Sequence, residues 1–132
     1  MEVGSDYSKI FTDDIIQLLF LKMAKCDSSE EICHVKFQSE TLHSILFESK
    51  KENPVLFSGF SFKLNGTYPY SEQIDNAEMR ARLTSLISES SNSRYNYTMK
   101  NQVKQLIESV IEPKFTKNDQ KILTDIAERI SI

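Results

Sequence analysis

Histidine and cysteine side chains are the first candidates for chemistry, and the chain has two of each. Cys26, Cys33, His34 and His43 are all residue types that bind zinc, but their spacing matches no closed zinc pattern. Cys33 and His34 are adjacent, so on a strand their side chains would point to opposite faces. We therefore predict no metal site and no cofactor, and interpret the four residues as ordinary thiols and imidazoles.

A cysteine nucleophile is the second chemical alternative, with Cys26 or Cys33 beside His43 as its base. The thiol pKa would have to be lowered by a helix start or a cation, and backbone donors would have to form an oxyanion hole. The chain has three glycines and no glycine-rich loop that could supply such donors or hold a phosphate. We predict no catalytic residue and no enzymatic activity; a small hydrolase or metal enzyme is the third hypothesis for function.

Length and composition predict one domain. The chain has 132 residues, of which 39% are hydrophobic and 27% charged, which is enough for a single core. We expect residues 1–6 to be flexible and residues 7–132 to form the domain. The formal net charge of −3 argues against a dedicated nucleic-acid-binding domain, which is usually basic.

The sequence predicts a cytoplasmic protein that does not bind membranes. The N-terminus lacks the basic and apolar regions of a signal peptide. The most apolar stretch, residues 15–24, is too short to span a bilayer, which takes about 20 residues. In the cytoplasm, we expect Cys26 and Cys33 to be reduced.

The elements that would position these side chains follow from hydrophobic periodicity and from helix-capping residues. We expect a helix from Thr12, a strand at 32–37, a helix from Ser39 to Pro54, a strand at 55–64, a helix at 72–87 capped by Ser71, a polar run at 88–93, a strand through Tyr95, Tyr97 and Met99, a helix at 103–111 stopped by Pro113, and a last helix capped by Thr116. The first helix is apolar nearly all round, so it is either central or covered by a partner chain. In the 72–87 helix, alanines and large apolar residues lie on opposite sides, so either both sides are buried or the helix breaks near Arg82.

This order resembles the winged helix-turn-helix fold with an α-helical C-terminal extension. The stretch 60–64, followed by Gly66, the run 68–71 and then Ile74-Asp75, is similar to prokaryotic SocA-like or Panacea antitoxin-type domains, in which an aromatic strand leads into a Gly-Pro-Tyr-Ser-like turn and an acidic-capped helix. This sequence departs from that pattern, because Thr67 and Tyr68 separate Gly66 from Pro69. The resemblance implies an α+β, winged-helix-like fold, mainly helical, with about five helices and a small antiparallel sheet.

Two surfaces follow from this fold. A candidate nucleic-acid or partner surface combines the cations and tyrosines of the 72–87 helix and the wing: Arg80, Arg82, Arg94, Tyr95, Tyr97, Lys100 and Lys104. A candidate protein interface uses Tyr68 and Tyr70 near the turn. We predict a non-catalytic protein-interaction module that binds a protein partner or a second copy, and the resemblance implies a defence, toxin–antitoxin or regulatory assembly. The alternative is a sequence-specific DNA-binding transcriptional regulator.

Overall fold

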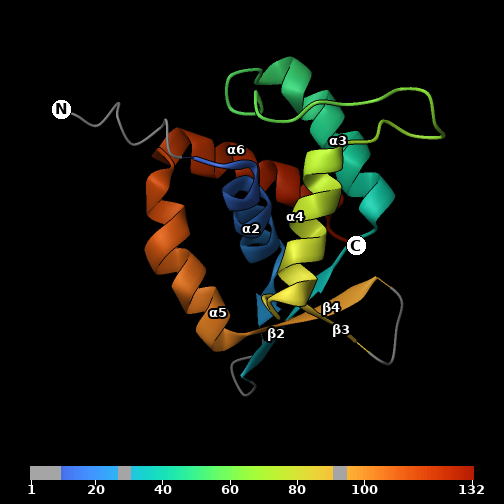
Figure 1. Ribbon diagram of the computed structural model, residues 1–132. Helices are drawn as coiled ribbons and strands as arrows, with labels where there is room; N and C mark the ends of the chain where they lie inside the picture. The colour runs from blue at the N-terminus through green and yellow to red at the C-terminus, as the bar shows by residue number, and fades with distance from the viewer. Residues whose placement is uncertain (1–9, 27–30, 91–94) are drawn as a thin grey trace.

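The computed structural model describes residues 10–26, 31–90 and 95–132 (Figure 1). The elements in chain order are α2 (Thr12–Met23), β1 (Lys25–Cys26), β2 (Ile32–Lys36), α3 (Ser39–Glu52), α4 (Glu72–Leu83), β3 (Ser88–Glu89), β4 (Asn96–Lys100), α5 (Asn101–Leu106), the π-helical segment η1 (Ile107–Ile111), the 3-10 turn η2 (Glu112–Lys114) and α6 (Lys117–Ile130). Five α-helices and one small antiparallel sheet within these residues confirm the predicted α+β class. No described helix is long and apolar enough to cross a membrane. The segment predicted to be flexible, 1–6, lies outside the described residues.

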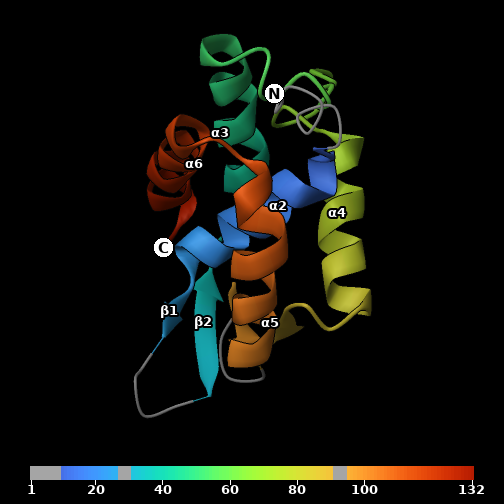
Figure 2. The ribbon, with the colours of Figure 1, turned by 90° about the vertical axis from the view of Figure 1, so that its left-hand side faces the viewer.

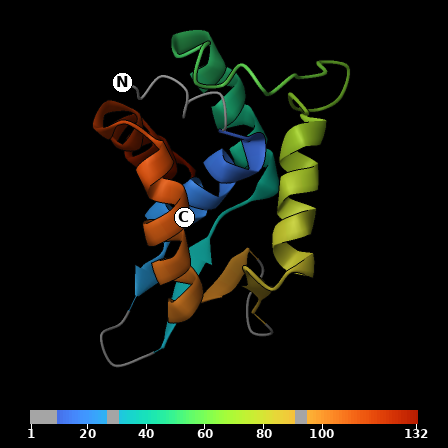
Figure 3. The same ribbon diagram turned by 60° about the vertical axis from the view of Figure 1, so that its left-hand side comes forward.

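Helix α2 lies at the centre of the fold, between α4 on one side and the α5–η1 segment on the other (Figures 1 and 3). Its apolar residues are buried on nearly every side, and α4, α6, η1 and β2 all pack against it. Of the two alternatives for this helix, the central position is therefore correct. Thr12 is its first residue and not its cap; Phe11 precedes the helix and donates its backbone N–H to Asp14 Oδ2 at 2.9 Å.

The sheet has the strand order β1-β2-β4-β3, and every neighbouring pair is antiparallel. The strands predicted at 32–37 and around Tyr97 form as β2 and β4, which pair over their full length. One face of the sheet carries Cys33, Val35 and Met99, all buried in the core. Helices α2, α3 and α6 lie above the strands (Figures 1 and 2), so the sheet closes one end of the core.

The connection between α3 and α4 corrects the strand predicted over residues 55–64. Residues 54–59 form turns, and the stretch that follows contributes only one isolated bridge. Phe57 and Phe60 are fully buried, whereas Leu64 is 66% exposed. The buried aromatics are therefore spaced for a turn that drops two rings into the core, and the alternation that follows Phe60 does not mark a strand.

Helix α4 begins as predicted and ends earlier than predicted. The Oγ of Ser71 accepts the N–H of Ile74 at 3.4 Å, which caps the start. The helix ends at Leu83, which is 76% exposed. Ser85 then adopts a positive φ of 60°, and the turn lets Ile87 enter the core separately. The helix therefore breaks, which was one of the two alternatives for its apolar pattern.

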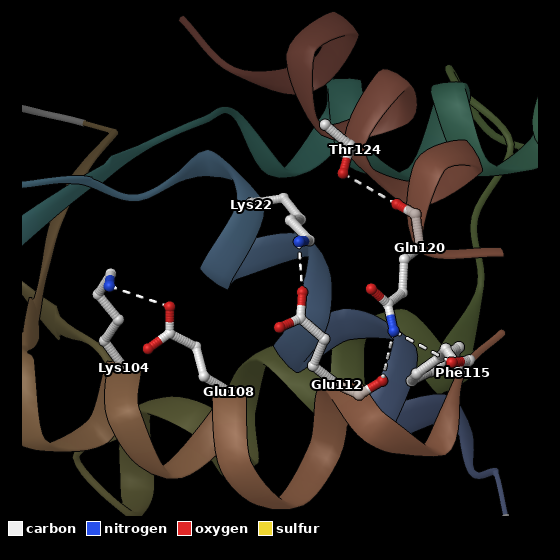
Figure 4. A network of polar contacts seen from close by, with 7 residues as sticks. All are labelled: Lys22, Lys104, Glu108, Glu112, Phe115, Gln120 and Thr124. Carbon is white, nitrogen blue, oxygen red and sulfur yellow. Dashed lines mark hydrogen bonds and ion pairs between the residues drawn. The ribbon is translucent and has the colours of Figure 1, made fainter. Parts of the chain in front are cut away.

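The C-terminal segment passes from α5 through η1 and η2 into α6 with little interruption. Pro113 does not stop a helix as predicted, because it lies in the 3-10 turn η2. Figure 4 shows the polar contacts at this corner: Lys22 of α2 pairs with the Glu112 carboxylate, and the Gln120 Nε2 donates to the backbone oxygens of Glu112 and Phe115 at 3.1 Å each. These contacts fasten the corner between η2 and α6 to the central helix.

The two cysteines are joined in a disulfide, which corrects the expectation of two reduced thiols. Cys26 of β1 and Cys33 of β2 are direct cross-strand partners, with 4.2 Å between their Cα atoms. Their spacing in the sequence did not reveal the pairing, because strand register decides which residues lie opposite each other. The crosslink holds the two-residue strand β1 against β2.

We predict that reduction of this disulfide lowers the free energy of unfolding by about 2 kcal/mol, because the crosslink restricts the unfolded chain over a short loop. Urea denaturation with and without a phosphine reductant measures the difference. The double variant Cys26→Ala/Cys33→Ala is the control and should not respond to reductant. Identical curves for the native chain under both conditions would contradict the prediction.

Candidate functional site

The predicted nucleic-acid surface is not assembled on one face of the molecule. The Arg80 guanidinium forms a bidentate pair with the carboxylate of Asp13 at the start of α2, with both N–O distances 2.7 Å. Lys104 pairs with Glu108 on its own helix segment at 3.0 Å. Tyr97 faces inward and stacks on Phe37 with 5.0 Å between ring centroids, and burial raises the pKa of its hydroxyl. Two of the cations are therefore engaged by carboxylates.

The other members of that predicted surface lie apart. Arg82 is exposed on α4, and its charge acts on the carboxyl of Glu78. Lys100 is exposed at the end of β4, and Tyr95 stands just before β4 with a positive φ of 63°. Arg94 lies outside the described residues.

Tyr68 and Tyr70, predicted as a protein interface, pack on His43 of α3. The Tyr70 ring stacks on the imidazole at 5.2 Å, and the Tyr68 ring meets it edge-on at 5.5 Å. The Tyr70 hydroxyl also donates to Asp75 at 3.2 Å. Both tyrosines are only half-buried. Their main contact is therefore internal, and they fasten the α3–α4 connection to α3.

His43 and Glu78 form a buried polar pair beneath these rings. The backbone N–H of Ser71 donates to His43 Nδ1 at 3.0 Å, so a neutral imidazole carries its proton on Nε2, which lies 3.8 Å from Glu78 Oε2. The Ser39 hydroxyl donates to the same carboxylate at 2.7 Å. Burial lowers the pKa of His43 below its ordinary 6.5, partly opposed by Asp75, and burial raises the pKa of Glu78 above its ordinary 4.5.

The four residues of the metal hypothesis are not brought together as ligands. Cys26 and Cys33 have no thiolate to offer, because both are in the disulfide. His34 lies on β2 and His43 on α3. In the ranges that the structure describes, no three histidine, cysteine, aspartate or glutamate side chains are grouped to hold a metal ion.

The most apolar hollow of the described surface is a cleft of about 400 Å³ between the start of α2, the turns at 54–59 and the start of α6. We call it the α2 cleft; its lining is Ile10, Phe11, Thr12, Ile15, Val55, Leu56, Ser58, Gly59, Thr116 and Asp119. Phe11 is 64% exposed and Val55 87% exposed. Two large apolar side chains therefore stand open to solvent beside an apolar floor.

The walls of the α2 cleft are held by close contacts. A Cβ on Gly59 would come within 2.9 Å of the Thr12 methyl group, so glycine lets the turn approach the helix. Lys114 pairs with the buried Asp14 at 3.0 Å and lies 5.6 Å from the Phe11 ring centroid. The cleft is consequently a formed feature of the fold, with an aromatic ring and a cation along one wall.

Sequence reasoning did not find the α2 cleft. Its signals are Phe11 immediately before a helix and Val55 immediately after Pro54, two large apolar residues where the chain turns at the surface. Neither signal separates an exposed residue from a core residue without the packing of the three segments. The site could therefore be recognised only in the folded structure.

We predict that Glu78→Gln raises the free energy of unfolding at pH 7 by about 1 kcal/mol, because an amide fits the buried position without a buried charge. Native Glu78 keeps its proton to higher pH than the unfolded chain does, so its contribution to stability falls as pH rises above 4.5. The advantage of the glutamine should therefore shrink toward zero near the ordinary pKa. Chemical denaturation across this pH range measures it.

Glu48→Gln is the matched control, because Glu48 is exposed on α3 and its replacement makes the same charge change. Both proteins should lose stability as the pH falls below about 6.5, since His43 remains neutral in the fold while the unfolded chain binds a proton. A Glu78→Gln protein less stable than the parent at pH 7 would show that the buried carboxylate is favourable there.

The chain was compared with models of protein families, with curated proteins and with solved structures, and none of the three comparisons found a match. The resemblance to winged-helix and antitoxin-type domains therefore stays a prediction.

Proposed function

We propose that this chain is a non-catalytic protein-interaction module that holds an apolar anchor of a partner protein in the α2 cleft. The observation that carries the proposal is the exposure of Phe11 and Val55 beside an apolar floor. Apolar side chains in a concave site bind by removing their own surface and that of the ligand from water. Aromatic residues in such sites are typical anchors of protein interfaces.

The size and charge of the cleft define the partner. A volume of about 400 Å³ is near the lower end of ordinary ligand sites, so it suits one or two apolar side chains. Asp119 lines the cleft, and its backbone N–H is already bound by Thr116. Its carboxylate favours a lysine or arginine next to the apolar anchor. We therefore propose a short partner segment that combines a large apolar residue with a neighbouring cation.

The non-catalytic part of the proposal rests on how the polar groups are used. His43 and Glu78 are buried in packing and hydrogen bonds between α3, α4 and the connection. A place in a defence, toxin–antitoxin or regulatory assembly rests on the resemblance alone. A cytoplasmic location belongs to the same proposal, although disulfides such as Cys26–Cys33 are more common in oxidising compartments.

We predict that peptides selected on the native chain from a random library, with counter-selection on Val55→Asp, share an apolar residue beside a cation. Val55→Asp should weaken their binding at least about tenfold, because it puts a charge at the cleft wall. Leu64→Asp is the matched control, since Leu64 is an exposed apolar residue of the same connection outside the cleft lining. Fluorescence anisotropy measures the affinities.

NMR shifts on titration should map the bound peptide to Ile10, Ile15 and Leu56, and thermal melting should show that both variants remain folded. Equal losses from Val55→Asp and Leu64→Asp would contradict the proposal. A chain that dimerises through the cleft would instead identify a second copy as the partner, and sedimentation of the native and Val55→Asp proteins would reveal it.

A further inference from the structure

The outer face of the sheet, opposite the core, concentrates positive charge. Antiparallel register places Lys25 opposite His34, Lys36 opposite Asn96, and Lys100 opposite Ile32. Directly opposed residues share a face, so all six lie on the side away from Cys33, Val35 and Met99. Thr98 and Ser88 complete this face. The three lysines are exposed.

These charges are not neutralised within the described part of the chain. Lys25, Lys36 and Lys100 take part in none of the salt bridges between described residues. No outer-face position of the four strands carries an acidic residue. Glu31 shares a surface hollow with Lys100, and Glu128 shares one with Lys25, but both stand outside the strands. A protein of net charge −3 thus has a local cationic face.

We propose that this face binds duplex DNA, laid across the major groove. Strands β2 and β4 form a two-stranded antiparallel ribbon, an element that the groove admits. Lys36 and Lys100 stand at opposite ends of the ribbon, about 13 Å apart along the strands, close to the groove width of about 12 Å. Each lysine then meets a phosphate on one wall.

The side chains between the lysines favour duplex DNA over other polyanions. Asn96, Thr98 and His34 offer donors and acceptors suited to base edges. No aromatic residue occupies an outer-face position of the described strands, so unpaired bases have no stacking platform. The major groove of A-form RNA is too narrow for such an element. An acidic peptide would need the cations but not the polar row between them.

We predict that a labelled duplex of about 20 base pairs binds the disulfide-bonded chain with micromolar affinity at about 50 mM salt. With three phosphate contacts, affinity should fall roughly forty-fold between about 50 and 200 mM salt. The triple variant Lys25→Ala/Lys36→Ala/Lys100→Ala should lose at least about tenfold in affinity and most of the salt dependence. Anisotropy titrations measure both quantities.

The matched control is Lys63→Ala/Lys117→Ala/Lys121→Ala, which removes the same charge from exposed positions off the sheet and should change affinity less than about twofold. Val55→Asp, in the α2 cleft, should leave DNA binding unchanged, so this proposal and the cleft proposal can fail separately. Absence of binding at low salt, or equal losses from the two triple variants, would overturn the proposal. Equal or tighter binding of single-stranded DNA, duplex RNA or a polyglutamate peptide would also overturn it.

Discussion

Burial of α2 is the constraint on which the rest of the structure depends. An apolar helix with almost no polar face cannot stay in water, so every other layer is placed to cover it. The sheet closes one end of the core, α4 and η1 flank the helix, and α6 crosses it. The Phe20 ring of α2 meets Phe37 at 5.2 Å, and Phe37 stacks on Tyr97. This aromatic column joins the helix to the sheet.

Local chemistry made the helices and the two main strands predictable. Ser71 and Thr116 cap α4 and α6 through their own side chains, as expected from the sequence, because a cap acts within a few residues. The alternation in 95–99 and the β-branched residues near Val35 predicted β4 and β2. The turns at 54–59 failed because the burial of Phe57 and Phe60 depends on distant packing, which overrides local pattern.

The surfaces could not be predicted because they depend on contacts between distant segments. Arg80 was a candidate cation for DNA, and Asp13, sixty-seven residues earlier in the chain, engages it. Cys26 and Cys33 read as separate thiols until β1 and β2 are aligned. The α2 cleft is built from three separate segments, so neither Phe11 nor Val55 alone marks it. Residue type was read correctly in these cases, and its partner was not.

The central helix also separates the two proposed binding surfaces. The α2 cleft surrounds the first residues of α2, whereas the sheet begins at Lys25, directly after its last turn. A helix of 12 residues is about 18 Å long, so a ligand at one end does not reach the other. Because α2 is packed on all sides, it fixes the distance between the surfaces, and a partner protein and a nucleic acid can occupy them together. Any coupling between them would have to pass through the packing of α2 itself.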